Sequence, residues 1–172
     1  MTRTSSRQGF TLIELLLVIG IIAILAAIVI VAINPTKQLG DARDAERRNG
    51  VNTILNAIWQ YAIDHGGNLP CQGTSSDDTT TTPCVDGSWR VLGTDTTGCD
   101  STVTCPVSTV ARVAACLDLS RLASTYVVSI PGDPKTGTTA GNRRYIVSTP
   151  AGGRVTVSAC NPEQTGSISV TR

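Results

Sequence analysis

One residue near the N-terminus is chemically at odds with its surroundings. From Phe10 to Ile33 every residue is uncharged except Glu14. On insertion scales a carboxylate at the middle of a bilayer costs about 3 kcal/mol, so an ionisable residue in a membrane-length apolar segment indicates a partner or a function. From the residues alone, the simplest interpretation of Glu14 is a carboxylate that reaches the membrane edge near the N-terminus.

The cysteines are the second group of residues that could do chemistry. All of them follow residue 70: Cys71, Cys84, Cys99, Cys105, Cys116 and Cys160. A structural zinc site uses cysteine pairs about two to four residues apart with further cysteine or histidine ligands. Here the shortest spacing is Cys99 to Cys105, and His65 is the only histidine. We therefore expect disulfides formed in an oxidising compartment.

The cysteine spacing also suggests a pairing. Our preferred connectivity is Cys71–Cys84, Cys99–Cys105 and Cys116–Cys160. The first two bonds would close short polar loops, and the third would tie a central segment to a late strand.

No combination of residues indicates an enzyme. The sequence has no Gly-rich phosphate loop, no Ser/His/Asp set and no paired-carboxylate motif. The 14 Lys and Arg residues nearly balance the 13 Asp and Glu residues, which gives no reason to expect nucleic-acid binding. The loop residues Asp77, Asp78, Asp95 and Asp100 do not follow the spacing of an EF-hand calcium loop. We predict no catalytic residue, no metal and no cofactor.

The apolar segment has the length of a membrane span. Phe10–Ile33 contains 24 residues, which as a helix would extend about 36 Å, against a hydrocarbon core of about 30 Å. The apolar core of a cleaved secretory signal is shorter, about 7–15 residues. Arg3 and Arg7 precede the segment and should keep the N-terminus in the cytoplasm. The remainder would then lie outside, where cysteines can oxidise.

The stretch RQGFTLIELLLVIGIIAILAAI resembles the class III signal of type IV pilins and of type II secretion pseudopilins. A short basic leader ends in Gly9, and Phe-Thr-Leu-Ile-Glu follows it at the start of an unbroken apolar helix. The resemblance implies that a prepilin peptidase cuts between Gly9 and Phe10 and methylates the new amino terminus. It also implies that Glu14 pairs with the positive amino terminus of Phe10 on a neighbouring subunit. Opposite charges in a low dielectric are costly alone and tolerable together.

We expect an α+β protein with a pilin-like layout. A long N-terminal α-helical spine, first transmembrane and then amphipathic, would carry a small globular head that contains an antiparallel sheet. The predicted segments are a cleaved leader at 1–9, a transmembrane or filament-core helix at 10–33, an amphipathic continuation at 34–66 and a disulfide-rich head at 67–172.

Three features shape the predicted spine. Pro35 should kink or break the helix where the apolar segment ends. Gly66 and Gly67 should stop it, with His65 as a helix-end residue. Between them one apolar stripe has helical spacing, and its members are Val51, Ile54, Leu55, Ile58 and Ala62.

A charged cluster precedes this stripe. It contains Asp41, Arg43, Asp44, Glu46, Arg47 and Arg48. One interpretation is a solvated helix face with an Asp44–Arg48 pair at i,i+4. The other is charge pairing between subunits just beyond the apolar core of a filament. The interleaved acids argue against DNA binding by the three arginines.

The head should be built mainly from short strands. We predict strands at 89–92, 143–149, 154–160 and 168–171, with a hairpin around Pro150–Gly153. Short helices are predicted at 110–116 and 119–126, the second capped by Asp118. The stretch Pro131-Gly132-Asp133-Pro134 forces a turn and also resembles the heads of many pilins and pseudopilins.

The combined prediction is a structural subunit of a type IV pilus-like surface filament, assembled through its N-terminal helix. Its partners would be copies of itself and related pilins, the prepilin peptidase, an inner-membrane assembly platform and, before assembly, membrane lipid. The chain would cross the inner membrane once, with its C-terminus outside, and later join an extracellular filament. The Thr-rich head with its cysteines favours an exposed pilus over a type II secretion pseudopilus. A membrane-anchored extracellular binding or enzyme domain that never polymerises is a third possibility.

Overall fold

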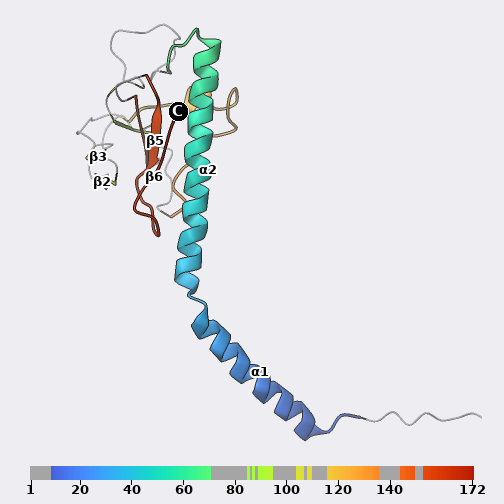
Figure 1. The fold of residues 1–172 in the computed structure, drawn as a ribbon. Coiled ribbons are helices and arrows are strands. Elements are labelled where there is room, and N and C mark those ends of the chain that lie inside the picture. The colour runs from blue at the N-terminus through green and yellow to red at the C-terminus, as the bar shows by residue number, and fades with distance from the viewer. Residues whose placement is uncertain are drawn as a thin grey trace, which may run out of the picture. The chain divides into compact units, whose positions relative to one another are not determined.

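The computed structural model describes residues 9–70, 85, 87, 89–94, 104–106, 108–109, 116–135, 144–149 and 153–172 (Figure 1). The chain divides into two compact units between Gln38 and Leu39. Two helices precede an antiparallel sheet of four strands, which confirms the predicted α+β class.

The first helix, α1, comprises Leu12–Ala32, and none of its residues is buried. It is long and apolar enough to cross a membrane, judged by length and composition. The chain then leaves the helical conformation at Ile33. A new helix begins at Pro35, where the side-chain oxygen of Asn34 accepts hydrogen bonds from the backbone N–H of Lys37 and the hydroxyl of Thr36. Proline suits a first helical position because it needs no backbone donor there, so Pro35 separates two helices.

The second helix, α2, comprises Pro35–Asp64, and the predicted apolar stripe is buried along it. Gly66 follows the helix with a φ of +65°, and the N–H of Gly67 donates to the carbonyl oxygen of Ala62 over 2.7 Å. This is the Schellman arrangement, in which glycine takes the left-handed conformation just past the helix end. His65 lies at the helix end as predicted and stacks on Tyr61 with 3.9 Å between ring centroids.

The main sheet has the strand order β1-β4-β5-β6, with every neighbouring pair antiparallel. The strands are β1 Arg90–Val91, β4 Tyr145–Ser148, β5 Thr156–Ala159 and β6 Ile168–Thr171. A separate small sheet pairs β2 Thr104–Cys105 with β3 Ser108–Thr109. The predicted hairpin corresponds to β4 and β5, and the last strand has the predicted bounds. Figure 1 shows β5 and β6 beside α2.

The predicted helix at 119–126 is wrong. Only a single 3-10 turn forms, η1 at Ser120–Leu122. Ser124 then takes a φ of 70°, and its N–H donates to the carbonyl oxygen of Val127 over 2.7 Å. This tight turn is incompatible with a continuing helix. The predicted capping residue is correct, since Asp118 accepts a 2.8 Å hydrogen bond from the backbone N–H of Ser120. The predicted helix at 110–116 lies outside the described residues, except for Cys116.

Two apolar clusters hold the head together, one on each face of the sheet. The larger joins the buried stripe of α2 to strand residues that include Tyr145, Val147 and Val157. The smaller contains Val91, Cys105, Cys116, Ile146 and Cys160. Successive residues of a strand point to opposite faces, so a strand covered on both faces is buried along its whole length, as β4 is.

Candidate functional site

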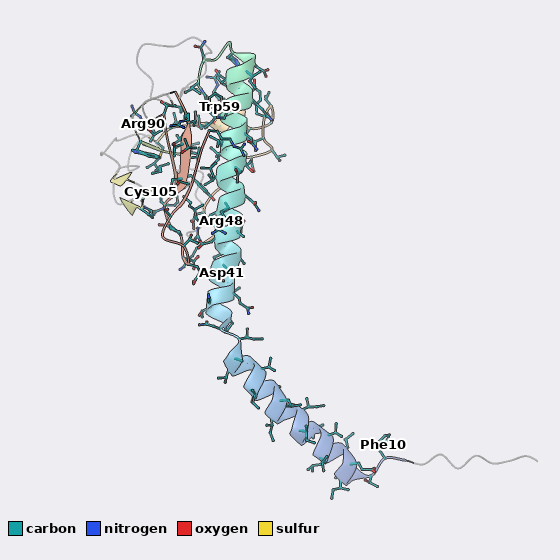
Figure 2. All side chains as sticks on the ribbon, in the orientation of Figure 1. Phe10, Asp41, Arg48, Trp59, Arg90 and Cys105 are labelled. Carbon is teal, nitrogen blue, oxygen red and sulfur yellow. A yellow bond between two sulfur atoms is a disulfide. The ribbon has the colours of Figure 1, made fainter. Side chains whose placement is uncertain are left out.

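The predicted cleavage point lies in an exposed, non-helical segment just before α1 (Figure 2). Phe10 is 90 % exposed. A Cβ atom added to Gly9 would meet no described atom within 4 Å. The fold of the chain therefore does not require glycine at position 9.

Glu14 has a role within its own helix that sequence reasoning missed. Its carboxylate accepts a 2.9 Å hydrogen bond from the backbone N–H of Thr11 and a 2.8 Å bond from the Thr11 hydroxyl. In return, the backbone N–H of Glu14 donates to the Thr11 hydroxyl oxygen over 3.3 Å. This reciprocal pair is a capping box, which satisfies donors that the first turn of a helix leaves free. The sequence signal was present, because Thr-x-x-Glu stands directly before an apolar run.

The capping box also places the carboxylate next to the cleavage point. Thr11 is the residue after Phe10, so a new amino terminus at Phe10 would lie one residue from the N–H that Glu14 already binds. The carboxylate of Glu14 would therefore lie near the positive charge of an amino terminus at Phe10.

Comparison with known families decides what this segment is. The family model described as the prokaryotic N-terminal methylation motif matches residues 4–30. The chain carries the prepilin signal of type IV pilins and pseudopilins. No curated protein and no solved structure matches the chain. The matched residues include the predicted cleavage point, the capping box and most of α1. The signal supports a pilin- or pseudopilin-like protein, and the apolar helix that follows it has the length and composition of a membrane anchor.

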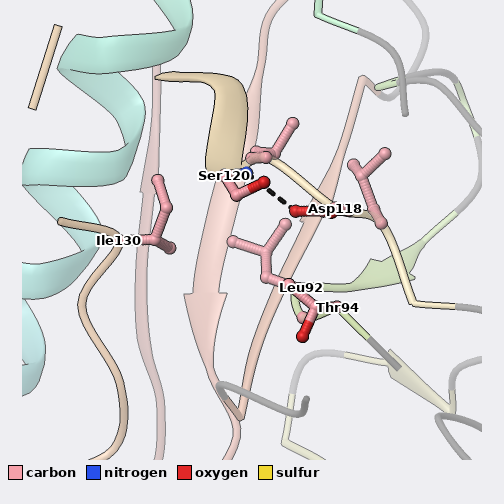
Figure 3. Close-up of a pocket in the computed structure, with 8 residues that line it drawn as sticks. Leu92, Thr94, Asp118, Ser120 and Ile130 are labelled. Atoms are coloured by element: carbon pink, nitrogen blue, oxygen red, sulfur yellow. Dashed lines mark hydrogen bonds between the residues drawn. The ribbon is translucent and has the colours of Figure 1, made fainter. Parts of the chain in front are cut away.

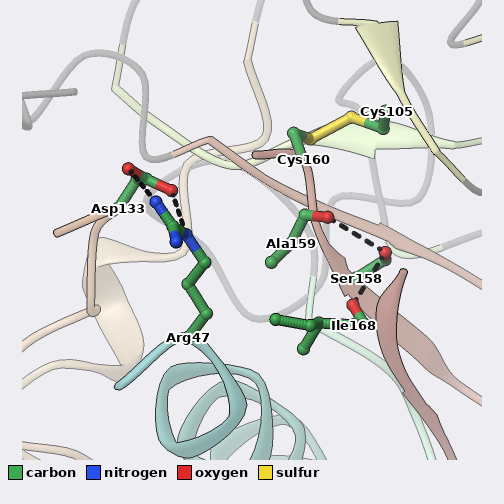
Figure 4. The surroundings of a disulfide bond; sticks show 7 residues. All are labelled: Arg47, Cys105, Asp133, Ser158, Ala159, Cys160 and Ile168. Carbon is green, nitrogen blue, oxygen red and sulfur yellow. Dashed lines mark hydrogen bonds and ion pairs between the residues drawn. A yellow bond between two sulfur atoms is a disulfide. The ribbon is translucent and has the colours of Figure 1, made fainter. Parts of the chain in front are cut away.

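The second candidate site of this pilin-like chain is a buried ion cluster on α2. Arg47 is fully buried, and its guanidinium donates two hydrogen bonds to Asp133, of 2.7 and 3.1 Å (Figure 4). It also donates to Asp44 over 2.8 Å and to Glu163 over 3.1 Å. Glu163 in turn contacts Arg43 at 3.0 Å and Lys135 at 3.2 Å. We call these six residues the Arg47 cluster: Arg43, Asp44, Arg47, Asp133, Lys135 and Glu163.

Asp44 fastens the loop between β5 and β6 to α2. Its carboxylate accepts hydrogen bonds from the backbone N–H groups of Glu163, Gln164 and Thr165, of which the shortest is 2.8 Å. Burial raises the pKa of Asp44, but the bonds from Gln164, Glu163 and Arg47 outweigh it and hold the pKa below its ordinary value. The pKa of Glu163 is lowered in the same way, because its bonds to Lys135 and Arg47 outweigh burial.

These contacts overturn both interpretations of the charged segment for its two buried members. Asp44 and Arg47 are neither a solvated face nor free for a neighbouring subunit, because they bind the head of their own chain. The pairing is Asp44–Arg47 at i,i+3, whereas Asp44–Arg48 was predicted. A signal existed in the sequence, since Arg47 and Asp44 lie four and seven residues before Val51 and extend its stripe at helical spacing. The Pro-Gly-Asp-Pro turn supplies the bidentate partner of Arg47, Asp133.

The disulfides differ from the preferred pairing. Cys105 on β2 is bonded to Cys160, which directly follows β5 (Figure 4). Cys99–Cys105 and Cys116–Cys160 are therefore both wrong. Cys116 is also disulfide-bonded and is buried in the same apolar cluster. Cys71, Cys84 and Cys99 lie outside the described residues. The preferred pairing assumed that cysteines close short loops, whereas the observed pair is 55 residues apart in the sequence. The two cysteines meet because both belong to the smaller apolar cluster, on the face of the main sheet opposite the larger one.

The remaining candidates carry little chemistry. Among the residues that the structure describes, no three His, Cys, Asp or Glu side chains are grouped to hold a metal ion. The four loop aspartates, Asp77, Asp78, Asp95 and Asp100, lie outside those residues. A hollow beside Leu92, Thr94 and Ile130 encloses about 20 Å³ (Figure 3). A space of this size holds about one water molecule. Asp118, which also lines it, already accepts a hydrogen bond from the backbone N–H of Ser120.

Proposed function

We propose that the chain is a structural subunit of a type IV pilus-like surface filament. The observation that carries the proposal is a prepilin signal whose cleavage point lies exposed in front of a helix with no buried residue. None of the 21 residues of α1 is buried, so the apolar side chains of this helix need lipid or other helices around them. A membrane supplies the first, and a bundle of copies supplies the second.

In this proposal a prepilin peptidase removes Met1–Gly9 and methylates the amino terminus of Phe10. The chain crosses the inner membrane once with its head outside, and an assembly platform in that membrane moves it into the filament. Glu14 caps α1 in each subunit and provides the negative charge that the amino terminus of a neighbouring Phe10 pairs with. The head contributes surface and spacing, and no enzymatic role is proposed for it.

A type II secretion pseudopilus is the second candidate, because pseudopilins carry the same signal. The two differ in what reaches the cell surface. A pilin gives long filaments that can be sheared off, whereas a pseudopilin supports export of other proteins.

The test is electron microscopy of sheared filaments, with mass spectrometry of their subunit. We expect a mature chain that begins with N-methyl-Phe10. Gly9→Val should leave full-length precursor in the membrane and no filaments, while the fold is unchanged because position 9 contacts nothing in the described structure. A mature chain that begins elsewhere, for instance after Ala32, would contradict the proposal. If the parent strain makes no filaments and deletion of this protein stops the export of other proteins, the pseudopilin is supported instead.

A further inference from the structure

The Arg47 cluster divides the charges of α2 into two groups. Asp44 and Arg47 point into the head, and Arg43 is bound to Glu163. Glu46 and Arg48 are exposed, and neither side chain forms an ion pair within the part of the chain that the structure describes. Glu46 and Arg48 are therefore an acid and a base that the described part of the head does not use, and Asp41, two turns before Arg48, is another exposed acid.

These two charges lie on opposite flanks of α2. Successive residues of an α-helix are about 100° apart around its axis. Because Arg47 is fully buried, Glu46 and Arg48 point to either side of the direction in which the head lies. They are therefore about 200° apart and cannot contact each other, as residues two apart on a helix never face one another.

We propose that Arg48 of one subunit pairs with Glu46 of the next, where the two α2 helices run side by side in parallel. This inference rests on the proposed filament. The occupant of each flank is a second copy of this chain, because opposite charges on opposite flanks match when identical copies stand next to one another. Each copy offers Arg48 to one neighbour and Glu46 to the other.

A contact of this kind uses two different patches of the same molecule and so repeats without limit unless a ring closes. An open assembly is what a filament requires. Arg47, which lies between these two residues in the sequence, is already bound to three acidic side chains of its own chain. It therefore does not compete with Arg48 for the Glu46 of a neighbouring subunit.

Charge reversal tests the contact. Glu46→Arg and Arg48→Glu should each reduce the amount of sheared filament at least tenfold, because like charges would then meet at every subunit boundary. The double variant Glu46→Arg/Arg48→Glu should restore filaments, because the pair is reversed in every copy. Since the two residues cannot contact each other within one helix, a rescue must come from between subunits.

A mixed-subunit experiment makes the same point independently. Cells that produce the Glu46→Arg chain together with the Arg48→Glu chain should build filaments, while neither chain alone does so. Asp41→Asn is the matched control. It removes an exposed acid from the same helix two turns before Arg48, where no contact is proposed, and should leave the amount of sheared filament unchanged.

The outcomes separate the two proposals. Normal filaments from both single variants would overturn the Glu46–Arg48 contact and leave the proposed function standing. A loss of filaments from Asp41→Asn as large as that from Glu46→Arg would show that assembly depends on the exposed acids of α2 in general and would overturn the contact as well. Absence of filaments from the unaltered chain in a competent strain would overturn the proposed function and this contact together.

Discussion

The hydroxyl oxygen of Tyr145 occupies the space that a side chain at Gly50 would need. A Cβ atom at position 50 would lie 2.6 Å from this oxygen and 3.1 Å from the ring carbon that carries it. Gly50 is in the interior of α2, where glycine costs about 1 kcal/mol relative to alanine. The glycine is therefore a steric requirement of β4, which brings the tyrosine against the helix.

Gly50→Ala should lower the free energy of unfolding by about 1–2 kcal/mol, because overpacking of the buried tyrosine exceeds the gain in helix propensity. Tyr145→Phe should restore most of this loss when combined with Gly50→Ala. On its own it should be neutral or stabilising, because the buried hydroxyl has no hydrogen-bond partner among the described residues. Urea unfolding of the detergent-solubilised chain measures both changes. A Gly50→Ala variant that is more stable than the parent would contradict this packing.

Removal of Arg47 should be among the most damaging single changes in the head. Arg47→Ala leaves Asp133, Asp44 and Glu163 without their shared cation, and loss of one member of a buried ion group costs about 3–5 kcal/mol. Arg47→Lys should be intermediate, because lysine keeps the charge but cannot bind Asp133 through two parallel bonds. Urea unfolding followed by tryptophan fluorescence gives the comparison. Arg48→Ala is the control, and equal losses at 47 and 48 would rule out the buried cluster.

The head should also lose stability in acid. Asp44 and Glu163 have pKa values below their ordinary values of 3.8 and 4.5. A lowered pKa means that the unfolded chain binds the proton more readily than the folded chain. The stabilisation is therefore complete above the unfolded pKa values and falls as the pH drops below about 4.5. Urea midpoints between pH 7 and pH 3 measure it. Asp44→Asn should flatten the decline, and an unchanged slope would exclude Asp44 as a contributor.

The two roles of Glu14 can be separated because glutamine keeps one of them. Glu14→Gln removes the charge but can still accept a hydrogen bond from Thr11 in a capping box. It should therefore insert and be cleaved after Gly9, while filaments fail to form or form slowly. Two further variants disturb the capping box itself. Glu14→Ala removes both the charge and the cap, whereas Thr11→Val weakens the cap and keeps the charge. Filament yield and precursor processing are the measurements. Normal filaments with Glu14→Gln would show that the carboxylate acts only locally.

The disulfide assignment can be read directly from a digest of unreduced protein. Mass spectrometry should find the peptide that contains Cys105 joined to the one that contains Cys160. Cys160→Ser should destabilise the head by about 2–4 kcal/mol, a typical contribution for one disulfide. Ser169→Ala, at an exposed position of the neighbouring strand β6, serves as a control substitution that removes no thiol. A Cys99–Cys105 peptide would contradict the structure.

Sequence patterns predicted the parts of this fold that depend on local periodicity. The apolar run of α1, the stripe that begins at Val51 and the final strand Ile168–Thr171 each repeat one spacing over several residues. Patterns failed where one residue changes the outcome. A positive φ at Ser124 ended the expected helix after a single turn.

The candidate site shows the same division. The cleavage point and Glu14 belong to one contiguous motif, so a short window of sequence was enough to find them. The Arg47 cluster joins α2 to residues 133, 135 and 163, and the disulfide joins residues 105 and 160. Neither grouping exists until the sheet brings distant segments together. The charged side chains of this segment were interpreted as a solvated face or as pairs between subunits, because their partners in the head lie more than eighty residues away in the sequence.

The face that α2 turns toward the head also limits how this protein could be recombined with its relatives. Gly40 gives room to Gln164, Asp44 binds the β5–β6 loop, Arg47 binds Asp133, and Gly50 gives room to Tyr145. Spine and head are thus not interchangeable modules. A chimera that joined this head to the helix of another pilin-like chain would need these four positions transplanted with it.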